Sequence, residues 1–193
     1  MIKKLSVIIW FLLLLFHLTG CSVVSSKYTI GERIQEDVSE QFDGVWDFDD
    51  SICYVKYLKN GELRLAGIEW KEKNFKLEEM TVILTKCGER NFINFRDPEI
   101  LGENDSDYLF GCYCSITENL LTVWAPKINA FEEAINSEKI KGKITKGKHS
   151  TTIHIKEPQE SLCDFIKNND ISKLFDLENP AIYKRIKKSG IKK

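Results

Sequence analysis

Two thiols separated by one residue, Cys112 and Cys114, could act together as metal ligands or as a redox pair. On an extended strand, residues two apart point to the same face and lie about 7 Å from each other. A metal site would need further ligands converging there, and the C-x-x-C spacing of thiol oxidoreductases is absent. We therefore expect both thiols to be buried against Tyr108 and Phe110, without metal or redox chemistry.

The histidines do not form a metal-binding pair. His149 and His154 are five residues apart on an expected strand, so their side chains should point to opposite faces. His17 lies in the apolar N-terminal leader. We expect His149 and His154 to be surface histidines or histidines whose hydrogen bonds are satisfied locally.

A group of carboxylates surrounds Trp46, which raises the possibilities of hydrolysis by paired carboxylates and of calcium binding. Its members are Asp43, Asp47, Asp49 and Asp50. The twelve-residue calcium-loop pattern is missing here and at 103–107, and no phosphate-binding glycine loop or serine nucleophile elbow occurs. A solvated strand end is therefore expected, and the sequence predicts a non-enzymatic protein with no catalytic residue, metal or cofactor.

The N-terminal leader has the layout of a secretory signal. Lys3 and Lys4 precede an unbroken apolar run from Val7 to Leu15. A membrane-spanning helix would need roughly 20 apolar residues, and this run is too short. Leu18-Thr19-Gly20-Cys21 resembles the lipobox of bacterial lipoproteins, which implies cleavage between Gly20 and Cys21 and removal of residues 1–20.

The lipobox resemblance further implies lipidation of Cys21, with diacylglycerol on its thiol and often a further acyl chain such as palmitate on its amine. Two or more chains anchor a protein stably in a bilayer. The expected location is therefore the bacterial cell envelope, and the outer membrane if the host is Gram-negative. The first partner expected from the sequence is the membrane itself.

The chain from residue 21 onward is nearly neutral and of single-domain size. It has 26 basic and 29 acidic residues, which gives no reason to expect nucleic acid as a partner. Five further cysteines follow Cys21, so an odd number cannot all pair within one chain. Buried inert thiols are expected, and the pairing stays open for Cys53, Cys87, Cys112, Cys114 and Cys163.

Three segments of different character are predicted after the leader. Residues 21–41 are polar and interrupted by Ser25-Ser26 and Gly31, which predicts a tether with a short helix over 32–41. Residues 42–187 are expected to form one domain. Residues 188–193 form a basic tail.

The domain is predicted to be mainly β. Period-two patterns from Phe42 to Ala125 indicate successive hairpins, and Asn60-Gly61 is a strong two-residue turn. Helical spacing follows from Ile128 and again after Pro158, which predicts two short helices flanking strands at 142–146 and 150–156. A last strand is expected over 181–186. Such a meander of about eight to ten strands usually closes on itself to remove its edges.

Gly44-x-Trp46 in the first strand and Tyr183-x-Arg185 in the last resemble the pattern of lipocalins and related calycins. The resemblance implies a barrel whose closed end is plugged by Trp46, with Gly44 allowing a close turn and Arg185 lying across the indole. Gly44, Trp46 and Arg185 are therefore the expected structural kernel. The two helices depart from the lipocalin pattern, which has one helix after the eighth strand.

Two functions are compatible with a tethered barrel that lacks catalytic groups. The first is a binding module for an apolar or amphipathic small ligand, since a barrel of about eight strands can enclose one. The alternative is a structural or interaction lipoprotein that has no ligand pocket and docks on another envelope protein, through the two helices or the basic end at 184–193.

Overall fold

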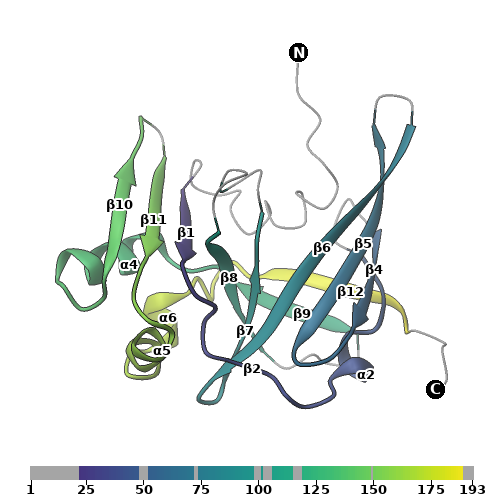
Figure 1. Ribbon diagram of the computed structural model, residues 1–193, viewed down its shortest axis with the longest axis horizontal. Helices are drawn as coiled ribbons and strands as arrows, with labels where there is room; N and C mark the ends of the chain where they lie inside the picture. The colour runs from purple at the N-terminus through teal and green to yellow at the C-terminus, as the bar shows by residue number, and fades with distance from the viewer. Residues whose placement is uncertain are drawn as a thin grey trace.

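The computed structural model describes residues 22–47, 52–71, 74–97, 101, 106–114, 119–148 and 150–188. Within them a twelve-stranded sheet forms a closed barrel with a short extension (Figure 1). The strands are β1 (Val23–Ser26), β2 (Glu32–Arg33), β3 (Gly44–Asp47), β4 (Ile52–Tyr57), β5 (Glu62–Lys71), β6 (Asn74–Cys87), β7 (Arg90–Phe95), β8 (Tyr108–Tyr113), β9 (Leu120–Trp124), β10 (Gly142–Lys146), β11 (Thr151–Ile155) and β12 (Ala181–Lys188). Because β12 runs to Lys188, the predicted basic tail begins inside a strand.

The barrel is an antiparallel meander closed by the last strand. Strands β3 to β9 pair in sequence order, and β12 inserts between β9 and β3. Eight strands therefore form the closed barrel, which confirms the predicted mainly β fold and is consistent with a lipocalin-like barrel. The Asn60-Gly61 hairpin is also confirmed, with φ of 54° and 71° at these residues, the left-handed values that a two-residue type I′ turn requires.

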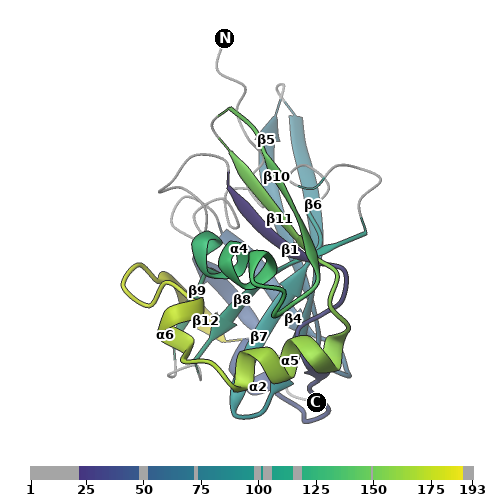
Figure 2. The same ribbon diagram turned by 90° about the vertical axis from the view of Figure 1, so that its left-hand side faces the viewer.

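Four short helices occur in the described chain, two of them at the predicted places. The predicted pair is α4 (Ile128–Asn136) and α5 (Gln159–Lys167). The other two have four residues each, α2 (Ser39–Phe42) and α6 (Ile171–Leu174). Helices α4, α5 and α6 all lie beside the sheet extension, on one side of the barrel (Figure 2). No described helix has the length and apolar character that crossing a bilayer requires.

The sheet branches at β8. The start of β8 pairs with β1, in the register Ser25 with Leu109, whereas its end pairs with β9, in the register Tyr113 with Val123. On its other side β1 pairs in parallel with β11, and β10 forms the outer edge. Strands β1, β11 and β10 therefore extend the sheet away from the closed barrel.

The tether predicted over residues 21–41 is corrected by the structure over residues 22–41. All four residues of β1 are buried, and Val24 has no exposed surface. The two serines that suggested a flexible segment are also fully buried, and Ser25 finds partners on neighbouring strands. The predicted helix over 32–41 is replaced by β2, which pairs with the end of β6, and by α2.

Two apolar cores lie on opposite sides of the barrel wall. One fills the barrel interior and includes Trp46, Phe95 and Tyr183. The other lies between the outside of β7 and β8 and the helices, and includes Phe92, Phe110 and Phe131. Val24 and Ile153 belong to this second core, so the extension is packed onto the domain.

A charge placed at Val24 tests whether β1 is part of the fold. Val24→Asp buries a carboxylate among apolar side chains, and we expect it to lower the free energy of unfolding by about 3 kcal/mol or more. Urea denaturation of residues 22–193 measures this change. Lys27→Asp, at an exposed residue just after the strand, should change the stability by less than about 0.5 kcal/mol. Equal stability of both variants would show that residues 22–26 are dispensable.

Candidate functional site

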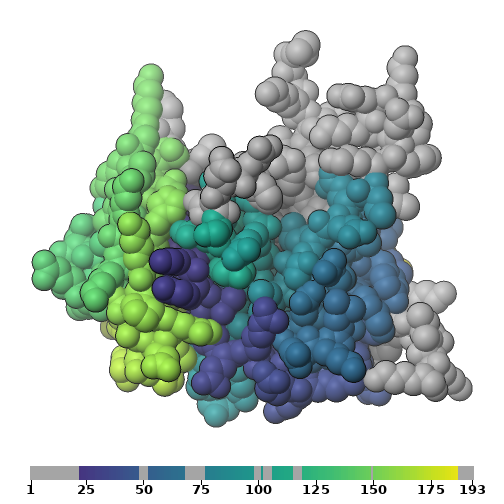
Figure 3. Space-filling model, in the orientation of Figure 1, coloured from purple at the N-terminus to yellow at the C-terminus, as the bar shows by residue number. Residues whose placement is uncertain are grey.

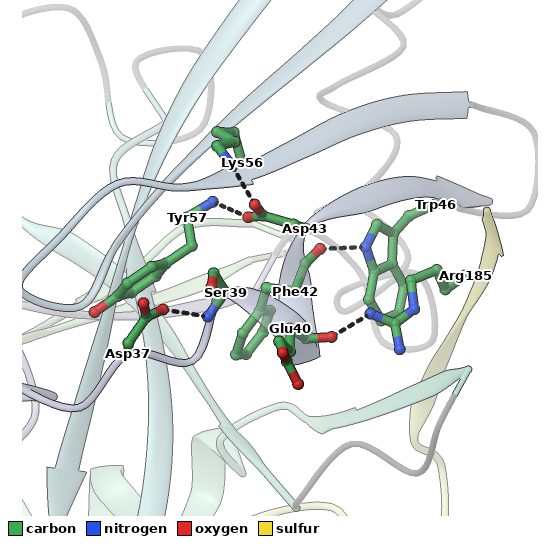
Figure 4. Close-up of polar contacts among 9 residues, drawn as sticks. All are labelled: Asp37, Ser39, Glu40, Phe42, Asp43, Trp46, Lys56, Tyr57 and Arg185. Carbon is green, nitrogen blue, oxygen red and sulfur yellow. Dashed lines mark hydrogen bonds and ion pairs between the residues drawn. The ribbon is translucent and has the colours of Figure 1, made fainter. Parts of the chain in front are cut away.

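The structure brings Trp46 and Arg185 together at one end of the barrel (Figure 4). Trp46 is only 1% exposed, and its Nε1 donates a hydrogen bond of 2.7 Å to the Phe42 carbonyl oxygen. The Arg185 guanidinium lies 5.4 Å from the centre of the indole ring. A guanidinium over an indole face is attractive by roughly 0.5 to 2 kcal/mol.

Arg185 also binds backbone carbonyl oxygens of the short helix α2. Its Nη1 donates hydrogen bonds of 2.9 Å to the carbonyl oxygens of Glu40 and Gln41. Gly44 follows with φ of 147°, a backbone conformation that side chains rarely adopt. Trp46, Arg185 and Gly44 therefore hold α2 against the end of the barrel, and their role is structural.

The two described carboxylates near Trp46 occupy different environments. Asp43 is buried, accepts a 2.6 Å hydrogen bond from the Tyr57 backbone nitrogen and pairs with Lys56 (Figure 4). The hydrogen bond to Asp43 raises the pKa of Lys56. Asp47 lies half-buried on β3, on the opposite face from Trp46. Among the described residues, no group of three or more His, Cys, Asp and Glu side chains could hold a metal ion.

The barrel interior is filled where the structure describes it. The cavity there measures about 20 Å³, which is room for one water molecule. Binding pockets for small molecules generally measure about 300 to 1,000 Å³. The lining of the 20 Å³ cavity is apolar and consists of Phe42, Trp46, Val55, Leu63, Leu65, Val82, Ile93 and Leu121. These described side chains pack as part of the apolar core, and the space among them is too small for a lipid chain.

A larger groove of about 630 Å³ is open to solvent between the segment after β2 and α5. Five of its thirteen lining residues are charged, and they carry both signs: Glu32, Arg33, Glu36, Lys86 and Lys167. The mixture of both charge signs in an open groove differs from the enclosed apolar site that an apolar ligand would need.

Ser25, His154 and Asp107 form a cluster that the sequence did not reveal. The Ser25 Oγ lies 3.0 Å from His154 Nδ1 and donates to Asp107 Oδ2 at 3.2 Å, and His154 Nδ1 lies 3.3 Å from the same oxygen. In a catalytic triad the hydroxyl and the carboxylate contact different ring nitrogens. Here both contact Nδ1 and Ser25 is fully buried, so the cluster joins β1, β11 and the start of β8.

The cysteines fall into three classes. Cys87 and Cys163 form a disulfide that joins the end of β6 to α5, with Cα atoms 5.7 Å apart. Burial raises the pKa of the Cys53 thiol and of the Cys112 thiol to about 12. Cys114 lies just after β8 and is exposed, so the prediction that it is buried beside Cys112 is wrong.

An apolar surface covers the outside of four adjacent barrel strands, β9, β12, β3 and β4. Its most exposed members are 37–59% accessible and are Ile52, Tyr54, Leu120, Ile182 and Ile186. Lys184 lies among them, opposite Leu120 on one side and Asp47 on the other. We call this surface the outer wall. The sequence carried a signal for it, since apolar residues fill both faces of the segment from Ser51 to Leu58.

Several predicted residues lie outside the described part of the chain. They are Gly20 and Cys21 of the lipobox, Asp49 and Asp50 of the acidic group, His149, and residues 189–193 of the basic tail. The cleavage and lipidation at Gly20 and Cys21 stay predictions.

Arg185→Met removes the guanidinium from the kernel while keeping much of its volume. Two carbonyl oxygens lose a charged donor and Trp46 loses its cation, so we expect a loss of about 3 kcal/mol in the free energy of unfolding. Urea denaturation measures it. Lys184→Met, at the exposed neighbouring position, is the matched control and should lie within about 0.5 kcal/mol of the native chain.

The thiols of native residues 22–193 should differ sharply in reactivity. At pH 8 a thiol with a pKa near 12 is ionised to only about one part in 10⁴, and burial also blocks access to Cys53 and Cys112. We expect an aromatic disulfide reagent to modify Cys114 rapidly, and Cys114→Ala to abolish this fast reaction. Unfolding in denaturant should expose all three free thiols. Fast modification of two thiols in the native chain would contradict the burial.

Comparison with protein-family models, curated proteins and solved structures finds no match to this chain. Its function is therefore argued from the arrangement of its own residues. Among the described residues, that arrangement consists of a barrel with an apolar core, an internal disulfide and an exposed apolar outer wall.

Proposed function

We propose that the protein is a lipid-anchored component of the bacterial cell envelope whose barrel docks on another envelope protein. The membrane anchor is the lipid on Cys21, and the docking surface is the outer wall. The protein acts by binding rather than by catalysis. The observation that carries the proposal is the outer wall, where five large apolar side chains are exposed on β9, β12 and β4, with β3 between the last two strands.

The outer wall has the composition expected of a protein-binding surface. Isolated exposed apolar residues are normal, but a contiguous group with a polar centre is typical of interaction sites. Tyr54 and the neighbouring isoleucines supply the apolar contact. Lys184 and Asp47 supply two opposite charges that a partner can match, which favours one binding orientation.

The disulfide supports an extracytoplasmic location. Disulfides persist in oxidising compartments and are rare in the reducing cytosol. The Cys87–Cys163 bond closes a segment in which the two cysteines are 76 residues apart, and it fixes α5 to the barrel wall. A chain that is exported and then anchored through Cys21 would fold where this bond is stable.

The small-ligand alternative receives less support from the described residues. The cavity of about 20 Å³ among the described interior side chains cannot hold an acyl chain, and the large groove is open to solvent and lined by residues of both charge signs. Displacement of a fluorescent fatty acid from residues 27–193 would favour the ligand function, although this truncation removes β1. Residues 22–193 are therefore the better material, because they keep every described strand and helix.

Site-specific photocrosslinking in the native host tests the docking surface. A photoreactive phenylalanine at position 182 should give one discrete adduct with another envelope protein. The same residue at position 28 is the matched control, because Tyr28 is 40% exposed and lies just after β1, in the extension and not on the outer wall. Ile52→Glu in the same chain should lower the adduct yield roughly ten-fold or more, since burying an isoleucine contributes about 1.5–3 kcal/mol.

Three outcomes would contradict the proposal. Equal adducts from positions 28 and 182 would mean that the outer wall is not selective. An adduct of twice the chain's mass would indicate self-association instead of a different partner. Retention of Cys21→Ala in the membrane fraction would reject the lipid anchor, which otherwise predicts release of this variant.

A further inference from the structure

The hairpin β10–β11 carries an unusual concentration of positive charge. The stretch 139–156 contains no acidic residue and has six lysines, Lys139, Lys141, Lys143, Lys146, Lys148 and Lys156. The rest of residues 21–193 has 20 basic and 29 acidic residues, a net charge of −9. The hairpin is therefore basic, whereas the rest of residues 21–193 is acidic.

The hairpin presents these lysines to solvent. All six are exposed, and the strands project past α4 at the upper end of the view in Figure 2. Figure 3 shows the same hairpin as a narrow green projection at the upper left of the view. Lys146, Gly147 and Lys148 form its tip, which is closed by a 2.8 Å hydrogen bond from the Gly147 nitrogen to the Ser150 carbonyl oxygen.

Little negative charge neutralises the tip. Lys146 forms an ion pair with Glu132 of α4, with 2.5 Å between Nζ and Oε1. Among the described residues, this is the ion pair seen for the hairpin lysines. Glu157 accepts a hydrogen bond from the Lys141 backbone nitrogen, at the opposite end of the hairpin from the tip. Lys143 lies opposite His154, beside the cluster with Ser25 and Asp107.

The start of the folded chain lies beside this tip. Strand β1 runs parallel to β11 with Val23 opposite Thr152, so its first residues lie next to the first residues of β11. The Thr151 backbone nitrogen donates a 3.0 Å hydrogen bond to the Ser22 Oγ. Cys21 directly precedes Ser22 in the chain, and consecutive Cα atoms are about 3.8 Å apart. A lipid on Cys21 would therefore leave almost no slack between the bilayer and the hairpin.

We infer that the β10–β11 hairpin is a second membrane contact, at which Lys146 and Lys148 of the tip, together with Lys143 of β10, bind anionic lipid headgroups. The inference rests on the proposed lipid anchor. Charges act over a Debye length of about 8–10 Å in physiological salt, and an anchor at Cys21 holds the tip within this range. One lysine near an anionic surface strengthens binding roughly five-fold.

Protection of a sheet edge does not account for this arrangement. Lysines on an edge strand prevent aggregation, and β10 is such an edge. That role concerns residues within the strand, such as Lys143, whereas Lys148 lies in the turn and Lys156 follows the inner strand β11. Acidic side chains protect an edge as well as basic ones, and the hairpin contains none.

Vesicle sedimentation of residues 22–193 tests the hairpin without the lipid anchor. At low salt we expect binding to vesicles of phosphatidylcholine with about one third phosphatidylglycerol, and no binding to phosphatidylcholine alone. The variant with Lys143→Gln, Lys146→Gln and Lys148→Gln should bind on the order of 100-fold more weakly, from three factors of about five. Raising the salt to about 0.5 M should remove most of the binding of the native chain.

The matched control replaces three exposed lysines elsewhere, with Lys59→Gln, Lys86→Gln and Lys173→Gln. It has the same net charge as the hairpin variant and should keep its binding within about three-fold. An equal loss in both variants, or unchanged binding of the hairpin variant, would overturn the inference. Tighter binding to a DNA duplex than to anionic vesicles would overturn it too, in favour of a polyanion site.

Failure of the anchor is distinguishable from failure of the hairpin. If Cys21→Ala stays in the membrane fraction while residues 22–193 still bind anionic vesicles through the three lysines, the anchor fails and the hairpin contact stands. If Cys21→Ala is released and the vesicle assay shows no charge preference, the anchor stands and the hairpin contact is overturned.

Discussion

The architecture depends on how β8 divides one edge between two partners. Its other edge is fully paired with β7, so the remaining backbone groups must serve both β9, which closes the barrel, and β1, which begins the extension. Gly111 lies at the change of partner. A Cβ atom there would come within 2.7 Å of the Val123 side chain, so only glycine lets β9 approach closely enough to close the barrel. Closure and branching thus both depend on one short strand.

This division gives the domain its second core. The outer faces of β7 and β8 would be exposed in a simple barrel, but the extension and the three helices cover them with aromatic side chains. The ring of Phe131 from α4 lies 5.9 Å from that of Phe110 on β8 and 6.2 Å from that of Phe175 after α6. The opposite wall has no such cover in the described structure, so its apolar side chains face solvent. The outer wall is the uncovered counterpart of a face that the domain covers with its own helices.

Features encoded locally could be predicted from the sequence, and features that depend on distant partners could not. The Asn60-Gly61 turn and the apolar spacing of α4 are local, because each is set by residues within a few positions. Strand β1 escaped prediction because it has only four residues, half of them serines, and its parallel partner lies 129 residues away. The spacing of Cys87 and Cys163 likewise contains no sign that α5 packs over the turn between β6 and β7. The Trp46 and Arg185 contact followed from a resemblance and not from their spacing.

The pairing of β1 with β11 also sets an order of events during synthesis. Residues 25 and 26 can pair with β8 once residue 109 is made, but β1 obtains its parallel partner β11 only when the chain has extended past residue 155. Until then the barrel strands β3 to β9 can pair with each other while the first residues remain extended and accessible. Any enzyme that processes the chain next to Ser22 therefore meets an open substrate before the domain closes over it. The first described strand to be made thus obtains its last partner strand only after β11 exists.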